Sequence, residues 1–275
     1  MPLRDTPGLE FVLSSLEEGG RGKPRFTVVL GSGLATACPD LGEVMEIPFN
    51  DIPGWLVGDV PGHSCTLRFG TWMGVEVAVQ LGRLHFYEGM DMETVVLPIS
   101  LMADLGVEGI FMSNAAGALN PIYAKGQLML VRDHINLMGD NPLRGTRDGG
   151  GKPVFLDLSS LYDERAGDMV KEAASLSGRP LEEGILVAVS GPTYETGAEL
   201  RFMRLIGGDA VSMSLVPEAL VAHHRGLAVT AVSVITNVWD MRRPQPLSHL
   251  EVLDVAEAAA PALKEVVAAW LKGIA

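Results

Sequence analysis

Residues 80–89 read QLGRLHFYEG and continue the apolar run Val75–Leu81, which is typical of a buried strand. Within this stretch Arg83, His85 and Tyr87 occupy alternate positions, so an extended chain would place their side chains on one face. A guanidinium, an imidazole and a phenol on one face suit an oxyanion attached to something flat or sugar-like. The alternative is an edge strand whose polar face is simply solvated.

The composition indicates a globular protein with a substantial core. The chain has 275 residues, of which 47% are hydrophobic, and this length suits one large α/β domain or two small ones. Its net charge of −13 disfavours a nucleic-acid partner, because a phosphate backbone is bound by a basic face. The two cysteines, Cys38 and Cys65, lack metal-site spacing and are expected to be reduced and buried, and no metal is expected.

The start of the chain does not look like a targeting segment. Residues 1–13 contain the acids Asp5 and Glu10 and no long apolar run, so no signal peptide is expected. No stretch reaches the roughly 18 uninterrupted apolar residues that a membrane span needs. We therefore expect a cytoplasmic protein that does not bind a membrane.

Apolar runs punctuated by glycine predict roughly seven to nine strands interleaved with helices. The expected strands include residues 26–30, 65–69, 75–81, 109–112, 127–131, 185–189 and 228–235. The expected helices are 9–18, 92–105 with an interruption at Pro98, 161–177, 197–206, 217–225 and 249–272. This pattern predicts a single domain over residues 1–275, with a central mixed β-sheet flanked by helices.

The expected strand 26–30 leads directly into Gly31-Ser32-Gly33-Leu34. Glycines at the end of a strand permit positive φ and leave backbone N–H groups that can bind an anion. A dinucleotide-binding loop is disfavoured, because Thr36 stands where its fingerprint needs a third glycine. A tight turn without a ligand remains the alternative.

Polar residues also follow several later strand signals. Asn114–Gly117 and Ser214 offer small side chains and free amides, which with Arg83 make a phosphate site that needs no metal. Glu195 and Asn237 offer different chemistry, because a carboxylate and an amide can read the edge of a heterocycle. Phosphate beside a heterocycle suggests phosphate attacking a sugar–base bond. Glu195 has an alternative role, in which its negative charge stabilises the helix expected at 197–206 by interacting with the positive end of the helix dipole.

Taken together, these motifs resemble those of purine nucleoside phosphorylases of the trimeric type, which have the nucleoside phosphorylase fold. The matching segments occur in family order between about residues 26 and 252. They are GSGL (31–34), GRLHFYEG (82–89), NAAG (114–117), RDHIN (132–136), GPTYET (191–196), MSLVPE (213–218) and ITN (235–237).

The resemblance implies a role for each matching residue. The implied phosphate ligands are Ser32, Arg83, His85, the Ala115 amide and Ser214, with His63 near them. The implied nucleoside contacts are Tyr87 and Met213 at the ribose, His249 at the 5′-hydroxyl, and Tyr194, Glu195 and Asn237 at the purine. Asn237, Glu195 and His85 are the implied catalytic residues. In a homotrimer, Phe155 is expected to reach a neighbouring subunit's pocket.

Two positions depart from the family pattern. Ala35 stands where the family usually has glycine, which is tolerable if φ is negative there. Trp239, just beyond Asn237, is expected to alter the entrance to the base pocket.

The resemblance implies phosphorolysis of purine ribonucleosides and deoxyribonucleosides to free base and ribose 1-phosphate, with inorganic phosphate as co-substrate and no cofactor. Glu195 can hold N1–H only on a base that carries that proton, so inosine and guanosine are expected to be preferred over adenosine. The nearest rival is a methylthioadenosine phosphorylase, in which an aspartate would be expected at position 237. A non-catalytic nucleoside-binding protein and a hydrolase are further alternatives, both disfavoured by the set of anion ligands.

Overall fold

The protein was analysed as a computed structural model that describes residues 6–57, 65–176, 178–239 and 248–274. The strands are β1 (Phe26–Leu30), β2 (Gly42–Pro48), β3 (Thr66–Trp72), β4 (Val75–Leu81), β5 (Gly109–Ala118), β6 (Leu128–Asn136), β7 (Glu182–Ala188), β8 (Ala210–Ser212) and β9 (Ala228–Val238). The α-helices are α1 (Leu9–Glu18), α2 (Met92–Val95), α3 (Leu97–Leu105), α4 (Glu164–Leu176), α5 (Gly197–Leu205), α6 (Val216–His224) and α7 (His249–Ile274). Short 3-10 helices are η1 (Ala35–Ala37), η2 (Phe49–Asp51) and η3 (Phe86–Glu88).

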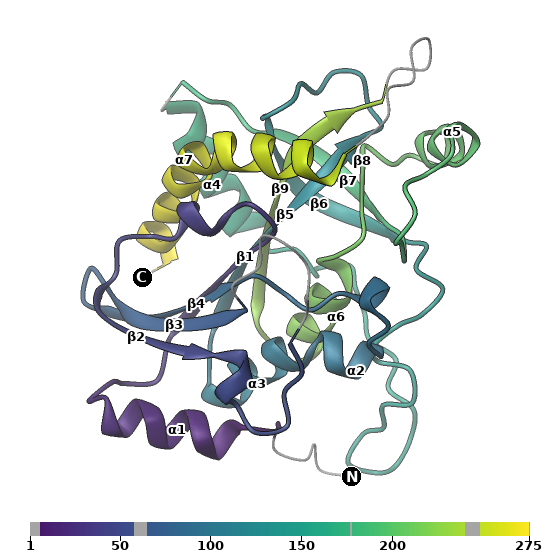
Figure 1. The fold of residues 1–275 in the computed structure, drawn as a ribbon. Coiled ribbons are helices and arrows are strands. Elements are labelled where there is room, and N and C mark those ends of the chain that lie inside the picture. Colours follow the sequence, from purple (N-terminus) through teal and green to yellow (C-terminus); the bar gives the residue numbers. More distant parts are fainter. Residues whose placement is uncertain (1–5, 58–64, 177, 240–247, 275) are drawn as a thin grey trace.

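Within the described residues, nine strands form one mixed sheet in the order β2-β3-β4-β1-β5-β8-β7-β6-β9 (Figure 1). Strand β9 also pairs with β5, so β5, β8, β7, β6 and β9 close into a ring. Strands β4, β1, β5 and β9 are mutually parallel, and their carboxyl ends therefore meet at one edge of the sheet. The expected α/β fold with a central mixed sheet is confirmed.

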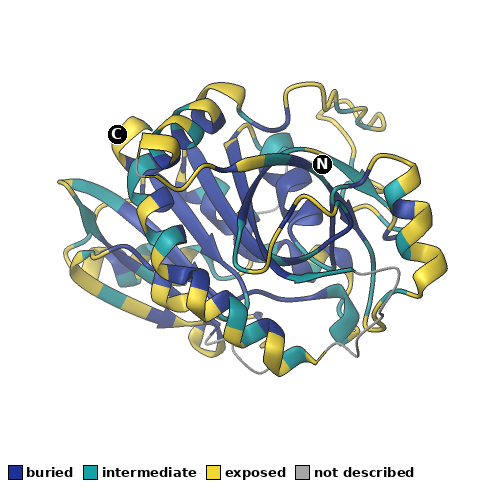
Figure 2. Cartoon of the chain, turned by 90° about the horizontal axis from the view of Figure 1, so that it is seen from above, coloured by how far each residue is buried: buried dark blue, intermediate teal, exposed yellow. Residues whose placement is uncertain are grey.

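Helices pack against the sheet. As far as the chain is described, most of the apolar core belongs to two large clusters. Helices α1, α2, α3 and α6 contribute to the first, through side chains such as Val12, Ile99 and Leu220. Helices α4 and α7 contribute to the second, through Val170 and Leu263. Figure 2 shows the buried strands lying between helices whose outer faces are exposed. None of the described helices is both long and apolar enough to span a lipid bilayer.

Several strands extend further than their apolar runs predicted. The parallel ladder of β5 and β9 continues through Ala118 and Val238, with a register shift between Ala116 and Gly117. The segments 114–117 and 235–237 therefore lie inside strands rather than after them. Strand β6 likewise includes residues 133–136, because its ladder with β7 continues to Asn136.

The stretch 82–89 is not an extension of β4, which corrects the expectation that alternation sets its side-chain directions. Gly82 and Gly89 both have positive φ, of 83° and 86°, and turn the chain at each end. His85 is extended, with φ of −123° and ψ of 144°, and the 3-10 helix η3 follows it at once. The side chains of this stretch are also buried at its centre, because Arg83 and His85 are only 1% and 4% exposed. The alternative of a solvated edge strand is wrong.

Candidate active site

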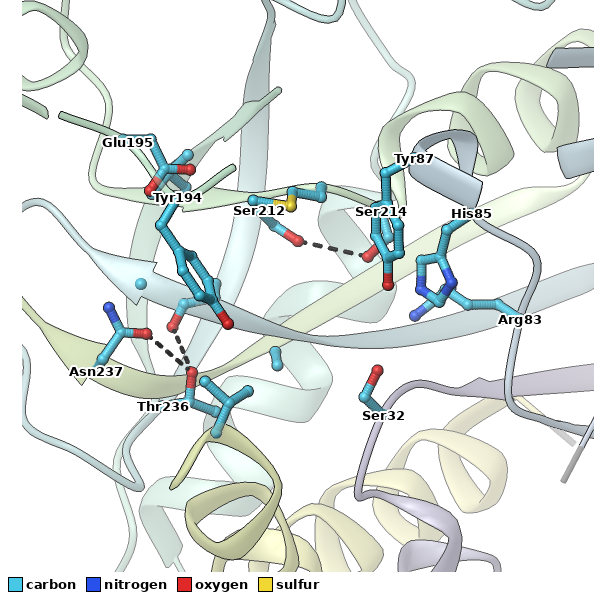
Figure 3. Close-up of a pocket in the computed structure, with 16 residues that line it drawn as sticks. Ser32, Arg83, His85, Tyr87, Tyr194, Glu195, Ser212, Ser214, Thr236 and Asn237 are labelled. Atoms are coloured by element: carbon cyan, nitrogen blue, oxygen red, sulfur yellow. Dashed lines mark hydrogen bonds between the residues drawn. The ribbon is translucent and has the colours of Figure 1, made fainter. Parts of the chain in front are cut away.

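Most of the predicted site residues line one pocket at the edge of the sheet where the parallel strands end (Figure 3). The pocket contains about 650 Å³ of space free of protein atoms, part of which is open to solvent. The predicted residues in its lining are Ser32, Arg83, His85, Tyr87, Ala115, Tyr194, Glu195, Met213, Ser214 and Asn237. They come from loops and strands spread over more than half of the chain, and the fold brings them together as expected.

The pocket has two chemically different ends. Figure 3 shows Arg83, His85, Tyr87 and Ser214 grouped at one side, while Glu195 and Asn237 lie across the cavity from them. One end therefore presents a guanidinium, an imidazole and hydroxyls, which are groups that bind oxyanions. The other end presents a carboxylate and an amide, which form directional hydrogen bonds with heteroatoms of a ring.

Arg83 is held rigidly although it lies in a loop. Its Nη1 donates to the Ser113 carbonyl at 2.7 Å, and its Nε donates to Glu218 Oε1 at 3.2 Å. Both partners are almost fully buried, with exposures of 0% for Ser113 and 2% for Glu218. A buried guanidinium fixed in this way is positioned before any ligand arrives.

His85 is fixed by a carboxylate and an aromatic ring. Its Nδ1 lies 3.0 Å from Glu88 Oε1, which also accepts the backbone N–H of His85 at 2.9 Å. The imidazole stacks on Tyr87, with ring centroids 4.6 Å apart and planes 18° apart. Burial lowers the pKa of His85, the Glu88 hydrogen bond opposes this, and the charge of Arg83 adds to the lowering. Because a carboxylate accepts, Nδ1 carries the proton, and a neutral imidazole keeps an accepting lone pair on Nε2.

The far end of the pocket is anchored in β9. The Thr236 hydroxyl lies 3.1 Å from Asn237 Oδ1 and 3.4 Å from the Ala116 carbonyl, within donating distance of both. Gly117, on the neighbouring strand β5, allows the amide to lie close, because a Cβ there would sit 2.8 Å from Asn237 Nδ2. At the same end of the pocket, burial raises the pKa of the half-buried Glu195.

A buried network supports the pocket from below. Asn114 Nδ2 donates to the Ser212 hydroxyl at 2.7 Å, and the Ser233 hydroxyl donates to Asn114 Oδ1 at 2.8 Å. Ser212 in turn lies 3.4 Å from the hydroxyl of Ser214. These contacts join β5, β8 and β9 beneath the cavity. The polar residues of the three strands are thereby fixed relative to one another.

The remaining expectations have different outcomes. His249 is the first residue of α7 and does not line the pocket, although Val252, three residues further along the same helix, does. Phe155 is 94% exposed and lies away from this chain's own pocket lining. His63 lies outside the described residues.

The two positions that depart from the family pattern are both described. Ala35 is the first residue of η1 and does not have positive φ, so its methyl group is tolerated. Trp239 is half-buried just after β9, outside the pocket lining.

Sequence reasoning missed some of the lining. Ala116 and Gly117 belong to the predicted segment Asn114–Gly117, whereas Val211, Ser212, Thr236 and Val252 were given no role. Ser212 and Thr236 each stand next to a predicted site residue in the sequence, and this position is the signal that could have identified them. Among the described residues, no group of three or more His, Cys, Asp or Glu side chains could hold a metal ion.

Comparison with known proteins places this fold and pocket in a family. The model of the Phosphorylase superfamily matches residues 25–272. Purine nucleoside phosphorylase 1 of Bacillus subtilis is 42% identical over 247 residues, with 90% of each chain covered. The purine nucleoside phosphorylase of Mus musculus is 40% identical, covering 92% of this chain and 90% of the relative.

Solved structures agree with the sequence relatives. The purine nucleoside phosphorylase of Schistosoma mansoni in complex with adenosine superposes with a TM-score of 0.88 and 31% identity, covering 97% of each chain. A schistosoma purine nucleoside phosphorylase in complex with hypoxanthine gives a TM-score of 0.89, also at 31% identity, covering 98% of this chain and 96% of the other. The chain therefore belongs to the phosphorylase superfamily and, within it, to the purine nucleoside phosphorylase family.

Proposed function

We propose that this pocket holds inorganic phosphate and a purine nucleoside side by side, and that the protein cleaves the N-glycosidic bond by phosphorolysis. Family membership makes the protein an enzyme of the pentosyltransferase class. The observation that carries the proposal is that one cavity has an end suited to bind an oxyanion and another end suited to bind a heterocycle. The products are the free base and ribose 1-phosphate, which places the reaction in purine salvage.

Phosphate occupies the end formed by Ser32, Arg83, His85 and Ser214, with the Ala115 amide as a further donor. The fixed guanidinium of Arg83 supplies the charge, and the hydroxyls supply directional hydrogen bonds. The unprotonated Nε2 of His85 accepts a hydrogen bond from a phosphate O–H group, which a neutral imidazole can do. Phosphate is a co-substrate in this scheme, and no cofactor takes part.

The nucleoside spans the rest of the cavity. Tyr87 and Met213 border the ribose, and His249, beside the pocket-lining face of α7, reaches the 5′-hydroxyl. Glu195 and Asn237 bind the purine edge, and Tyr194 packs on its ring. Burial raises the pKa of Tyr87, so its phenol stays protonated and can donate.

The proposed chemistry follows from this arrangement. As the bond from C1′ to N9 breaks, the ribosyl centre becomes oxocarbenium-like, and the adjacent phosphate oxygen stabilises this cation and then bonds to C1′. The bonding electrons leave with the purine, whose developing negative charge is stabilised by the Asn237 amide at N7 and the 6-oxo group. The purine finally takes up the proton that phosphate gives up. No carboxylate nucleophile is needed.

Specificity for 6-oxopurines rests on Glu195. A carboxylate accepts from N1–H of hypoxanthine or guanine, whereas adenine presents a lone pair at N1, and a mismatched buried contact is costly. The relatives' solved complexes include one with adenosine and one with hypoxanthine, so both base types enter pockets of this fold. The preference is therefore a property to be measured for this chain.

One assay tests the proposal and its rivals. The enzyme is incubated with inosine, guanosine, adenosine or methylthioadenosine, with and without phosphate, and the free base is quantified. We expect release from inosine and guanosine only with phosphate. Release without phosphate would indicate a hydrolase, and absence of release in every arm would indicate a binding protein. A strong preference for methylthioadenosine would assign the related phosphorylase activity instead.

We also propose that the enzyme works as a homotrimer in which Phe155 completes a neighbour's pocket. The support is that this phenyl ring is 94% exposed, the highest exposed fraction among the large apolar side chains of the described residues, so a second copy of the chain can contact it. Sedimentation measurements give the oligomeric state. Phe155→Ala is expected to raise the nucleoside KM without changing the phosphate KM.

The proposed setting is the cytoplasm. Cys38 and Cys65 are both buried and do not form a disulfide, which suits a reducing compartment. Fractionation of cells that produce the protein tests this assignment directly, with the activity expected in the cytosolic fraction.

A further inference from the structure

Glu218 is a buried acid that does not line the pocket, yet it contacts Arg83, which does, and Leu215, which follows the lining residue Ser214. It lies in the first turn of α6 and is 2% exposed. Its carboxylate accepts from Arg83 Nε, which lies 3.2 Å from Oε1 and 3.2 Å from Oε2. An isolated buried carboxylate is costly, so this pairing with a buried guanidinium is what makes the acid tolerable there.

The same carboxylate has a second contact, on the segment that carries Ser214. Glu218 Oε2 accepts the backbone N–H of Leu215 at 3.0 Å. Leu215 has φ of 75° and ψ of −49°, and the N–H of Val216 donates to the carbonyl of Ser214 at 3.0 Å. This is a γ-turn with positive φ, a conformation that is strained for a residue with a side chain. Such a turn persists only where surrounding contacts hold it.

We propose that Glu218 is a positioning residue that ties the two halves of the phosphate site together, with one carboxylate fixing both Arg83 and the turn after Ser214. This inference rests on the proposed phosphate site. The Arg83 loop follows β4, whereas Ser214 precedes α6, so these ligands are far apart in the chain. Glu218 contacts both segments directly. It therefore sets the separation of the guanidinium from the hydroxyl before phosphate binds.

The two contacts require a carboxylate of this length. A glutamine presents one accepting oxygen and one NH2 group, so either the Arg83 Nε–H or the Leu215 N–H would face another donor. An aspartate keeps the charge but is one methylene shorter and cannot hold both partners. Glu218→Gln and Glu218→Asp are thus both expected to loosen the phosphate site. If only the negative charge mattered, Glu218→Asp would behave like the parent enzyme.

The test distinguishes an effect on phosphate binding from an effect on nucleoside binding. For Glu218→Gln and Glu218→Asp, the phosphate KM is measured at saturating inosine and the inosine KM at saturating phosphate, and phosphate binding to the nucleoside-free enzyme is measured by calorimetry. We expect the phosphate KM and Kd to rise roughly tenfold, and the inosine KM to stay within about twofold. An unchanged or lower phosphate KM overturns the proposal, as does an equal rise in both KM values or parental behaviour of Glu218→Asp.

A matched control lies at the other end of the same helix. Asp104 also pairs with an arginine, Arg225 at the end of α6, and also accepts a backbone N–H, that of Thr6 at 3.1 Å. Asp104→Asn therefore removes a similar pair without touching the pocket, and is expected to lower thermal stability while leaving the phosphate KM unchanged. Loss of phosphate binding in this variant as well would show a general structural effect and overturn the proposal.

One further variant distinguishes failure of this inference from failure of the proposed function. Arg83→Ala is expected to raise the phosphate KM more than either Glu218 variant. If Arg83→Ala leaves the phosphate KM unchanged, the phosphate site itself is misplaced. If Arg83→Ala raises it and Glu218→Gln does not, the site stands and the positioning role of Glu218 is wrong.

Discussion

The Nδ1 atom of His85 lies 3.0 Å from Glu88 Oε1, three residues further along the chain, and this contact orients the imidazole toward the cavity. The carboxylate fixes which nitrogen carries the proton, and burial keeps the ring neutral. A neutral, buried histidine has consequences for both stability and catalysis.

The first prediction concerns pH and stability. Because burial lowers the pKa of His85 below its ordinary 6.5, the unfolded chain takes up a proton before the folded chain does as the pH falls. The stabilisation is present above pH 6.5 and is lost as the pH falls through the lowered value. His85→Gln should therefore flatten the decline in unfolding free energy over this range, measured by urea denaturation. An identical pH slope in parent and variant would contradict the prediction.

The second prediction concerns Glu195. Its burial raises the pKa above the usual 4.5, so the carboxylate that accepts N1–H is lost at a higher pH than for an exposed glutamate. The inosine KM should rise as the pH falls through this raised value. Glu195→Gln cannot titrate, and should both remove this acid limb and weaken the preference for inosine over adenosine roughly tenfold. Persistence of the limb in the variant would assign it to another group.

The third prediction concerns the purine end of the site. In Asn237→Asp, a carboxylate that accepts from a 6-amino group replaces an amide that donates to a 6-oxo group. The ratio of kcat/KM values should shift toward adenosine by roughly tenfold or more. The ratio is measured with inosine and adenosine under the same phosphate concentration. If neither value moves relative to the other, Asn237 does not contact the 6-position.

The fourth prediction uses a pair of glycines on β5. A Cβ at Gly117 would lie 2.8 Å from Asn237 Nδ2, so Gly117→Ala should displace that amide and reduce kcat/KM for inosine by roughly tenfold or more. Gly109→Ala is the matched control, because its nearest neighbour would be 3.5 Å away, an ordinary contact. Equal effects of the two substitutions on kcat/KM would show that loss of strand glycine, rather than displacement of Asn237, is responsible.

Strands that consist of an apolar run ending at a glycine were predicted accurately. Both β1 and β4 have the predicted bounds, because each is an apolar run that ends at glycine. The ends of β5 and β9 were underestimated, since small polar residues there are supported by a parallel ladder between distant segments. Strand β8 spans only residues 210–212, too few for periodicity to reveal.

Sequence motifs predicted many residues of the site, but they did not predict its long-range contacts. Arg83, His85 and Asn237 carry chemistry that motifs record, and they do line one pocket. The directions of Arg83 and His85 followed from glycine-bounded turns rather than from strand alternation. The contact of Glu218 with Arg83 could not be predicted from the sequence, since the two residues are 135 positions apart and both lie in the interior.

The closure of β5, β8, β7, β6 and β9 into a ring bears on how the enzyme handles its two substrates. Asn237 lies on β9, while Ser214 follows β8, and both strands bond to β5. If base and phosphate bind as proposed, the distance between them is set by backbone ladders, which have a nearly fixed spacing. In the proposed arrangement, the alignment of the two substrates is thus set when the chain folds. New substrates would accordingly be accommodated by exchanging side chains along these strands, with the backbone left as it is.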